Sequence, residues 1–370
     1  MVNTLVCGTS MREFDSHTTP QFEIKESFLK ILFLLLFGII GYISIDKENH
    51  MNYKKIVVAG GGVLGSQIAF QSAYCGYDVT IWLRSEDSKT RTQPKLDALK
   101  KNYIETIESL NPQDENNWAR GIADIDHFNK EECLEKVERA YNSIRLEVDM
   151  KEAMKDADLV IESMAEIKDE KIQFYQTLAP FLEDKTVLVT NSSTLLPSTF
   201  AKYTGRPEKY LSLHFANTIW IKNTAEVMAH DETDKKYFDE IMEFATSIRM
   251  LPLPVLKEKS GYLLNSMLVP FLLSGMDLLT NGISDAKSID TAWKRGTGAP
   301  KGPFEIIDTV GLTTAKNIVE QYQKVPGLMS PLLRKMMLPY NYKGMLNMLN
   351  QYIEEGKLGK SSGEGFYKYN

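Results

Sequence analysis

Cysteine is scarce in this sequence, with only Cys7, Cys75 and Cys133 among 370 residues and no C-x-x-C pair. This odd, widely spaced set excludes a disulfide-stapled scaffold, is typical of a reducing compartment and argues against a zinc site. A basic excess is also missing, because 43 Lys and Arg stand against 49 Asp and Glu. General nucleic-acid binding is therefore not indicated. The remaining composition, 43% hydrophobic and 25% charged, predicts two or three ordinary globular domains.

Long apolar runs are scarce too, and the single candidate for a membrane segment lies within residues 28–45. A span needs at least about 17 apolar residues, and this run reaches that length only when Lys30 is included. We interpret residues 1–50 as an N-terminal extension with a mis-assigned start, because one back-translation of Lys47 and Glu48 is a bacterial ribosome-binding sequence suitably spaced before Met51. On this interpretation the protein is cytoplasmic. The alternative is a membrane anchor through residues 28–45.

A glycine-rich loop over residues 60–65 follows a short β-branched run and precedes a helical pattern. Its G-x-G-x-x-G spacing is typical of dinucleotide binding: the first glycine makes a tight turn, the second lets the backbone approach a pyrophosphate, and the third allows close helix packing. The following helix offers its first amides to the phosphates. A second strand pattern over residues 79–83 completes this context. The predicted cofactor-binding residues of the loop are Gly60, Gly62, Val63, Leu64 and Gly65.

The carboxylate that usually accepts the ribose hydroxyls of NAD, about 20 residues after the glycines, is missing. Leu83, Arg84 and Ser85 stand in its place. Because no carboxylate would repel a 2′-phosphate, Arg84 and Ser85 could bind one through charge-assisted hydrogen bonds. The sequence therefore favours NADP over NAD. Alternatively, Arg84 is solvated or stacks on adenine, and Glu86 or Asp87 reaches back to the ribose.

Further strand patterns over residues 158–162 and 185–190 alternate with helical stretches. This alternation predicts an α/β fold with a Rossmann-type doubly wound parallel sheet. The long, charged segment 89–145 is interpreted as a pair of helices that project from the sheet. A solvated hairpin and a ligand-binding arm are both compatible with it.

Polar residues that could carry chemistry follow the later strands. Ser193 comes after the strand over residues 185–190, at the carboxyl end of the sheet, where open α/β folds bind ligands. His214 lies 21 residues further on and is the one histidine of five at the end of a strand pattern; Glu226 follows after 12 residues, between apolar neighbours. Each alone is more typical of a structural residue. Their joint placement after a dinucleotide loop indicates a catalytic pair.

Seven short motifs follow one another along the chain. They are the glycine loop, residues 158–162 with Glu166 and Lys171, residues 191–193, residues 214–217, residues 261–265 with 268–270, residues 302–305 with Asp308 and 311–312, and residues 363–369. In this order they resemble the 3-hydroxyacyl-CoA dehydrogenases, including the 3-hydroxybutyryl-CoA members of that family. The resemblance runs from about Lys54 to Asn370.

The resemblance implies a nicotinamide-dependent oxidoreductase that interconverts a 3-hydroxyacyl-CoA and a 3-ketoacyl-CoA. His214 would be the general base, oriented by Glu226, and Ser193 and Asn265 would hydrogen-bond the reacting oxygen. The positions that match cofactor contacts of the family are Glu166, Lys171 and Asn217.

The resemblance also implies the domain organisation. A dinucleotide-binding domain is expected over residues 51–257, followed by an all-helical domain over residues 258–370 that closes over the nicotinamide and forms a homodimer.

Some positions depart from the family: Ala216 stands where a second aromatic is usual, and Thr218 stands where proline is common. These departures leave two alternatives open. One is a dehydrogenase of a CoA-free 3-hydroxy acid, such as gulonate or carnitine, and the other is a non-catalytic regulator that binds a nicotinamide nucleotide.

Overall fold

The computed structural model describes residues 53–323 and 340–369. The interpretation of residues 1–50, with the apolar run at 28–45, concerns residues outside these ranges. Within them, no helix combines the length and the apolarity that crossing a membrane requires.

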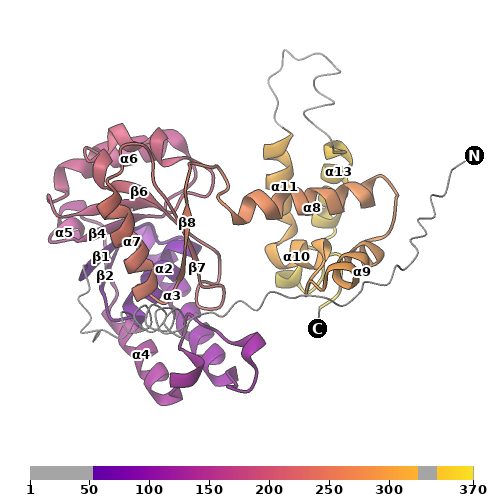
Figure 1. Ribbon diagram of the computed structural model, residues 1–370, viewed down its shortest axis with the longest axis horizontal. Coiled ribbons are helices and arrows are strands. Elements are labelled where there is room, and N and C mark those ends of the chain that lie inside the picture. The colour runs from indigo at the N-terminus through magenta and orange to yellow at the C-terminus, as the bar shows by residue number, and fades with distance from the viewer. Residues whose placement is uncertain (1–52, 324–339, 370) are drawn as a thin grey trace, which may run out of the picture. The chain divides into compact units, whose positions relative to one another are not determined.

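An eight-stranded sheet organises the N-terminal part of the described chain, in the order β3-β2-β1-β4-β5-β6-β7-β8 (Figure 1). The strands are β1 (Lys55–Ala59), β2 (Asp78–Trp82), β3 (Arg145–Glu147), β4 (Leu159–Glu162), β5 (Val187–Thr190), β6 (Tyr210–Phe215), β7 (Thr224–Met228) and β8 (Leu251–Val255). Strands β1 to β6 pair in parallel in the 3-2-1-4-5-6 order of the Rossmann fold, which confirms the predicted fold class. Two further strands, β7 and β8, were not predicted from the sequence: β7 runs antiparallel to β6, and β8 pairs with β7 in parallel.

Helices cover both faces of the sheet. Those of this part are α2 (Val63–Tyr74), α3 (Glu86–Ser109), α4 (Lys130–Ser143), α5 (Met150–Met154), α6 (Lys168–Leu178) and α7 (Lys235–Ser247). Successive side chains of a strand point to opposite faces, so Ile56 and Val58 of β1 join the core under α2, α3, α4 and α7. Val57 and Ala59 join the other core, under α5 and α6. Both faces are therefore buried, which accounts for the continuous apolar strands.

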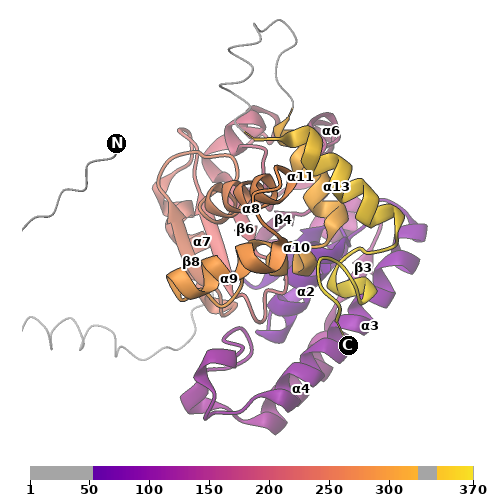
Figure 2. The ribbon, with the colours of Figure 1, turned by 90° about the vertical axis from the view of Figure 1, so that its right-hand side faces the viewer.

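The charged segment 89–145 contains most of α3 and all of α4, which pack along each other (Figure 2). Each helix buries a stripe of apolar residues at helical spacing and leaves its charges outside. On α3 the stripe consists of Leu96, Leu99, Tyr103 and Ile107, all at most 5% exposed.

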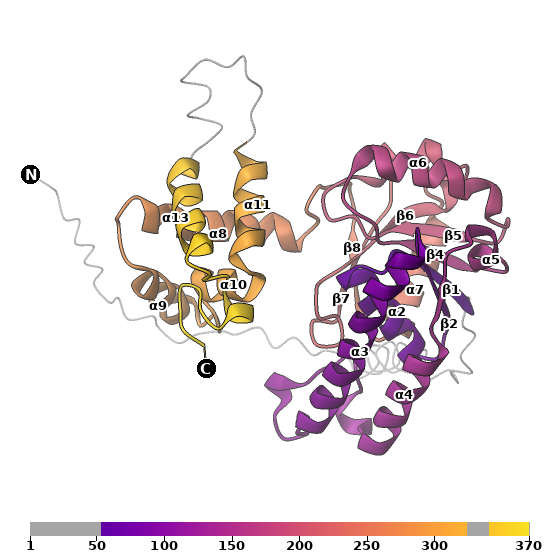
Figure 3. The same cartoon turned by 180° about the vertical axis from the view of Figure 1, so that it is seen from behind.

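The C-terminal part is helical, as predicted, and has a core of its own. Its helices are α8 (Leu264–Thr280), α9 (Ala286–Thr297), α10 (Pro303–Val310), α11 (Leu312–Tyr322) and α13 (Tyr342–Glu354). Helices α11 and α13 lie side by side (Figures 2 and 3). The C-terminal tail is fixed by Asp308, whose carboxylate accepts the amides of Phe366 and Tyr367 and the hydroxyl of Tyr369 at 2.8 to 2.9 Å.

Candidate active site

Strand pairing brings three of the predicted site residues together. His214 on β6 and Glu226 on β7 are register partners in the antiparallel pair. Opposed residues of such a pair have Cβ atoms roughly 4.5–5.5 Å apart on one face of the sheet. The register therefore brings these two side chains together although they are distant in the sequence. Ser193 follows β5, the neighbour of β6, at the carboxyl edge of the sheet.

Both ring nitrogens of His214 have hydrogen-bond partners. Nδ1 lies 2.9 Å from Oε2 of Glu226, and Nε2 lies 3.2 Å from Oγ of Ser193. His214 and Glu226 are 5% and 3% exposed. An ionised carboxylate can only accept, so Nδ1 carries the proton and the lone pair of Nε2 accepts the Ser193 hydroxyl. This is the tautomer that a general base acting through Nε2 requires.

Glu226 is held in its ionised form by several donors. Burial raises the pKa of this carboxyl, but hydrogen bonds from His214 and from the amides of Leu264 and Leu263 outweigh burial and bring the pKa below its usual value. The two amides donate to Oε1 at 2.9 Å, and both lie at the start of α8. The positive end of that helix dipole adds to the stabilisation of the carboxylate.

The loop that carries Ser193 is hydrogen-bonded to Glu166. Oε1 of Glu166 accepts the Ser192 hydroxyl at 2.5 Å, the Thr194 amide at 2.8 Å and the Leu195 amide at 3.2 Å. Burial raises the pKa of Glu166, but these donors and the nearby Lys171 outweigh burial and lower it. The structure therefore gives Glu166 a structural task on the serine loop, beside the cofactor contact that the resemblance implies.

Lys171, on α6, is buried inside the protein. Its Nζ donates to both carboxylate oxygens of Glu162 at 2.6 and 2.7 Å and lies 3.6 Å from Glu166. The side chains of Lys171 and Glu162 are 1% and 0% exposed. Its ammonium thus faces Glu162 in this structure, and Lys171 does not line the pocket described below.

Asn217 and Asn265 are two further residues that the resemblance places at the site. Asn217 accepts a hydrogen bond from Gln67 of α2 at 2.6 Å, which connects the loop after β6 to the helix after the glycine loop. The next residue, Thr218, has φ +61°, a conformation that proline, with φ near −65°, cannot adopt. Asn265 follows Leu264 in the first turn of α8 and is half-buried.

The glycine loop fits a dinucleotide. Gly60 has φ +123°, and a Cβ there would lie 2.5 Å from the carbonyl oxygen of Ser163. A Cβ on Gly65 would lie 2.1 Å from the Gly60 carbonyl oxygen, so helix and strand pack without room for a side chain. At Gly62 a Cβ would meet nothing within 4 Å, and α2 has no side-chain cap at its N-terminus. The free amides and the open space suit a phosphate group.

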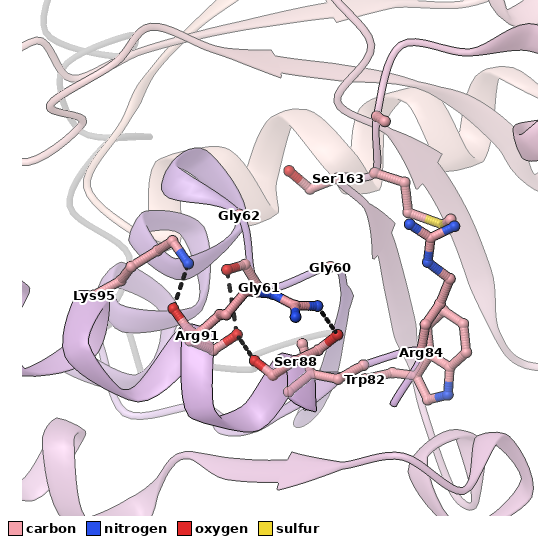
Figure 4. Close-up of a pocket in the computed structure, with 13 residues that line it drawn as sticks. Gly60, Gly61, Gly62, Trp82, Arg84, Ser88, Arg91, Lys95 and Ser163 are labelled. Atoms are coloured by element: carbon pink, nitrogen blue, oxygen red, sulfur yellow. Dashed lines mark hydrogen bonds between the residues drawn. The ribbon is translucent and has the colours of Figure 1, made fainter. Parts of the chain in front are cut away.

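A cavity of about 250 Å³ opens beside this loop (Figure 4). Three cations line it, with no carboxylate among its described lining residues: Arg84 after β2, and Arg91 and Lys95, which project from α3. Arg84 also pairs with Glu170 at 3.0 Å, with 65% of its side chain exposed. Arg91 donates to the Ser88 hydroxyl at 2.9 Å, and neither Arg91 nor Lys95 has an ion-pair partner within the described ranges.

Arg91 and Lys95 were not predicted as site residues from the sequence. Ser88, Arg91 and Lys95 are spaced by three and four residues, which places them on one face of a helix. That spacing was the available signal, but the segment was interpreted only as a solvated or ligand-binding hairpin.

Family comparisons match nearly the whole described chain. The model for the 3-hydroxyacyl-CoA dehydrogenase NAD binding domain matches residues 55–259. The model for the 3-hydroxyacyl-CoA dehydrogenase C-terminal domain matches residues 261–369.

Individual proteins agree with these matches. The mitochondrial hydroxyacyl-coenzyme A dehydrogenase of Homo sapiens is 29% identical over 316 residues, covering 85% of this chain and 91% of its own. The 3-hydroxybutyryl-CoA dehydrogenase of Clostridioides difficile is 28% identical over 324 residues, covering 85% and 99%. Among solved structures, a diketoreductase that acts on dicarbonyl compounds has a TM-score of 0.71 and 42% identity, covering 86% of this chain and 99% of its own. FadB2 of M. tuberculosis has a TM-score of 0.68 and 25% identity, covering 86% and 99%.

Proposed function

This chain belongs to the 3-hydroxyacyl-CoA dehydrogenase family, and from that premise we propose that it interconverts a 3-hydroxyacyl-CoA and a 3-ketoacyl-CoA with a nicotinamide cofactor. The observation that carries the proposal is the position of Nε2 of His214. It faces Ser193, while Nδ1 is occupied by Glu226.

In this proposal the side chains divide the proton chemistry among them. Nε2 of His214 takes the proton of the 3-hydroxyl group, and Glu226 stabilises the imidazolium that forms. Ser193 and Asn265 hydrogen-bond the reacting oxygen and keep it near Nε2. A bound oxidised nicotinamide would accept the hydride from carbon 3. In the opposite direction the imidazolium returns its proton to the ketone oxygen.

We also infer a preference for NADP. The support is the cavity beside the glycine loop, where Arg84, Arg91 and Lys95 gather and no carboxylate stands among the described lining residues. Guanidinium groups bind phosphate through charge-assisted hydrogen bonds, so these residues would hold a 2′-phosphate. Gly60, Gly62, Val63, Leu64 and Gly65 would hold the pyrophosphate. Glu166 and Asn217 remain candidates for contacts further along the cofactor, whereas the buried Lys171 would act only through Glu166, 3.6 Å from its Nζ.

A second candidate is the reduction of a CoA-free dicarbonyl or the oxidation of a CoA-free 3-hydroxy acid. The 42% identity to the diketoreductase favours it. The backbone at Thr218 favours it too, because its positive φ gives the loop after β6 a conformation that the proline common in the family cannot adopt.

An assay on the full chain separates these candidates. Nicotinamide absorbance would be followed with acetoacetyl-CoA, and in parallel with acetoacetate and pentane-2,4-dione, each with NADPH and with NADH. We expect the highest kcat/KM with acetoacetyl-CoA and NADPH. Higher kcat/KM with a CoA-free compound would instead support the second candidate. Cofactor binding without turnover of any compound would contradict both and favour the regulator.

The expected homodimer also has support. Helix α8 exposes Leu264, Met267 and Leu278 at 41%, 68% and 39%, at positions that share one helical face. Exposed apolar faces of this kind mark interaction sites. We propose that this face contributes to the contact between two copies, with light scattering as the test. A dimeric mass that Met267→Glu converts to a monomeric one would support it, and a monomeric wild type would contradict it.

A further inference from the structure

The segment that leads into α8, residues 260–264, touches the loop that carries Ser193. The hydroxyl of Tyr262 donates to the backbone carbonyl of the residue before Ser193, at 2.8 Å. The hydroxyl of Ser260 donates to the carbonyl of the residue after Ser193, also at 2.8 Å. Ser193 is therefore fixed on both sides by side chains from outside its own loop.

The ring of Tyr262 also touches His214. The two rings are stacked, with centroids 4.5 Å apart and an angle of 15° between their planes. Tyr262 is only 1% exposed. Burial raises the pKa of its phenol well above the ordinary value, so the hydroxyl stays protonated and remains a donor.

The backbone of Tyr262 is unusual for so bulky a residue. Its φ is +51°, directly after Gly261 at φ +81°. A left-handed conformation is rare for large side chains, and it persists only where the surroundings enforce it, often at functional sites. Two left-handed residues in succession turn the chain so that the ring lies on His214 and the next two amides, those of Leu263 and Leu264, meet Glu226.

We propose that Tyr262 is a positioning residue for the His214 imidazole and the Ser193 loop. The stacked ring fixes the plane of the imidazole, so that Nε2 points to Ser193 while Nδ1 stays on Glu226. The hydroxyl fixes the backbone before Ser193. One side chain thus sets the relative position of the base and the serine. This inference rests on the proposed function, in which His214 is the base.

Packing alone does not account for this arrangement. The apolar neighbours of Tyr262 are the small cluster of Met228, Val255 and Leu196. A leucine would fill such a cluster without a hydroxyl and without a ring, yet both parts of the tyrosine have specific partners here.

The test compares full-length variants Tyr262→Leu, Tyr262→Phe and Tyr77→Leu. Tyr77 is the matched control, because it is also buried, contacts a ring and hydrogen-bonds through its hydroxyl, but lies just before β2, at the opposite edge of the sheet from Ser193. We expect Tyr262→Leu to lower kcat with acetoacetyl-CoA by roughly 10- to 100-fold, because small misplacements of reacting groups cost that much. Tyr262→Phe, which keeps the stack, should lose only about 2- to 10-fold. Tyr77→Leu should lower the melting temperature and leave kcat per folded molecule unchanged, and cofactor Kd should be unchanged in all three.

A second readout does not depend on turnover. In protein labelled with ¹³C at the histidine ring, the stacked tyrosine shifts the His214 ring protons upfield. We expect this shift in the wild type and in Tyr262→Phe, and its loss in Tyr262→Leu. An unmoved resonance, or a kcat for Tyr262→Leu equal to that of Tyr77→Leu, would overturn the proposal. If the wild type turned over no substrate, the proposed function would fail, while the resonance would still test the positioning.

Discussion

Two buried pairs of ionisable side chains lie near the carboxyl ends of the parallel strands β4 and β6, and they differ in how many of their polar atoms form hydrogen bonds. In the first, Glu162 accepts from Lys171, from the Met164 amide and from the hydroxyls of Tyr175 and Thr190, all at 2.6 to 2.9 Å. Neither of its ionisable side chains is more than 1% exposed.

In the second pair, Glu226 accepts from Nδ1 of His214 and from two backbone amides at the start of α8, all at 2.9 Å, but the other ring nitrogen of His214 is less fully engaged. Among the residues that the structure describes, Nε2 of His214 has the hydroxyl of Ser193 as its hydrogen-bond partner, and this hydroxyl can turn to another acceptor. Buried polar groups that are completely satisfied stabilise one structure, whereas a site for proton transfer needs a group with a lone pair to offer. We therefore propose a structural role for Glu162 and Lys171 and a catalytic role for His214 and Glu226.

The largest effect on kcat is expected from removing Nε2 of His214. His214→Ala should lower kcat by about 100- to 10,000-fold, the usual worth of a general base. Cofactor Kd, followed by fluorescence titration, should change little. His230→Ala is the matched control, because His230 is also buried but its Nδ1 accepts the amide of Glu232, which leaves the proton of a neutral ring on Nε2 and no lone pair free there. Equal kcat for the two variants would remove His214 from its assigned role.

In the pair of Glu162 and Lys171, a substitution should instead lower the stability of the fold. Lys171→Met should lower the free energy of unfolding by about 3–5 kcal/mol, because it leaves a buried carboxylate without its counter-charge. Adding Glu162→Gln should recover much of the loss, since the charge is then removed as well. Urea unfolding of the single and double variants measures both. A double variant that loses the sum of the single losses would show that the charges do not act as a pair.

A smaller effect, on cofactor affinity, is expected at the cavity beside the glycine loop. Arg91→Ala should weaken NADPH about 10- to 100-fold, the worth of one charge-assisted hydrogen bond, and leave NADH nearly unchanged. Arg84→Ala should act in the same direction. Lys101→Ala is the control on α3, because its side chain is 76% exposed and faces Glu105. Equal changes for NADPH and NADH would contradict the phosphate site.

The smallest effect is expected in the dependence of the unfolding free energy on acidic pH. The pKa of Glu226 in the folded protein is lowered, so its ionised form stabilises the fold above the unfolded pKa, about 4.3, and this contribution is lost as pH falls through the lower folded value. The unfolding free energies of the wild type and Glu226→Gln should therefore converge from pH 7 towards acid. A constant difference over this range would argue against an ionised Glu226.

The sequence was sufficient for the dinucleotide loop because its glycines are required by backbone geometry, as at Gly60. The sequence also pointed to His214 and Glu226, which the structure places in hydrogen-bond contact, but it did not predict β7, the strand whose register makes them neighbours. Arg91 and Lys95 were missed because charges on a helix are ordinarily solvated. Tyr262 was missed because a left-handed tyrosine leaves no signal beyond the glycine before it, and its stack joins segments far apart in the chain.

The most direct test of the central claim is a side-by-side measurement of Glu226→Gln and Glu162→Gln. Each variant would be assayed as full-length protein with acetoacetyl-CoA and NADPH, with kcat normalised to the folded fraction from unfolding curves. The account predicts that Glu226→Gln loses roughly 100-fold in kcat while most of it stays folded. Glu162→Gln should lose stability and keep its kcat per folded molecule. Equal losses of kcat in the two variants would contradict the division between a structural and a chemical pair.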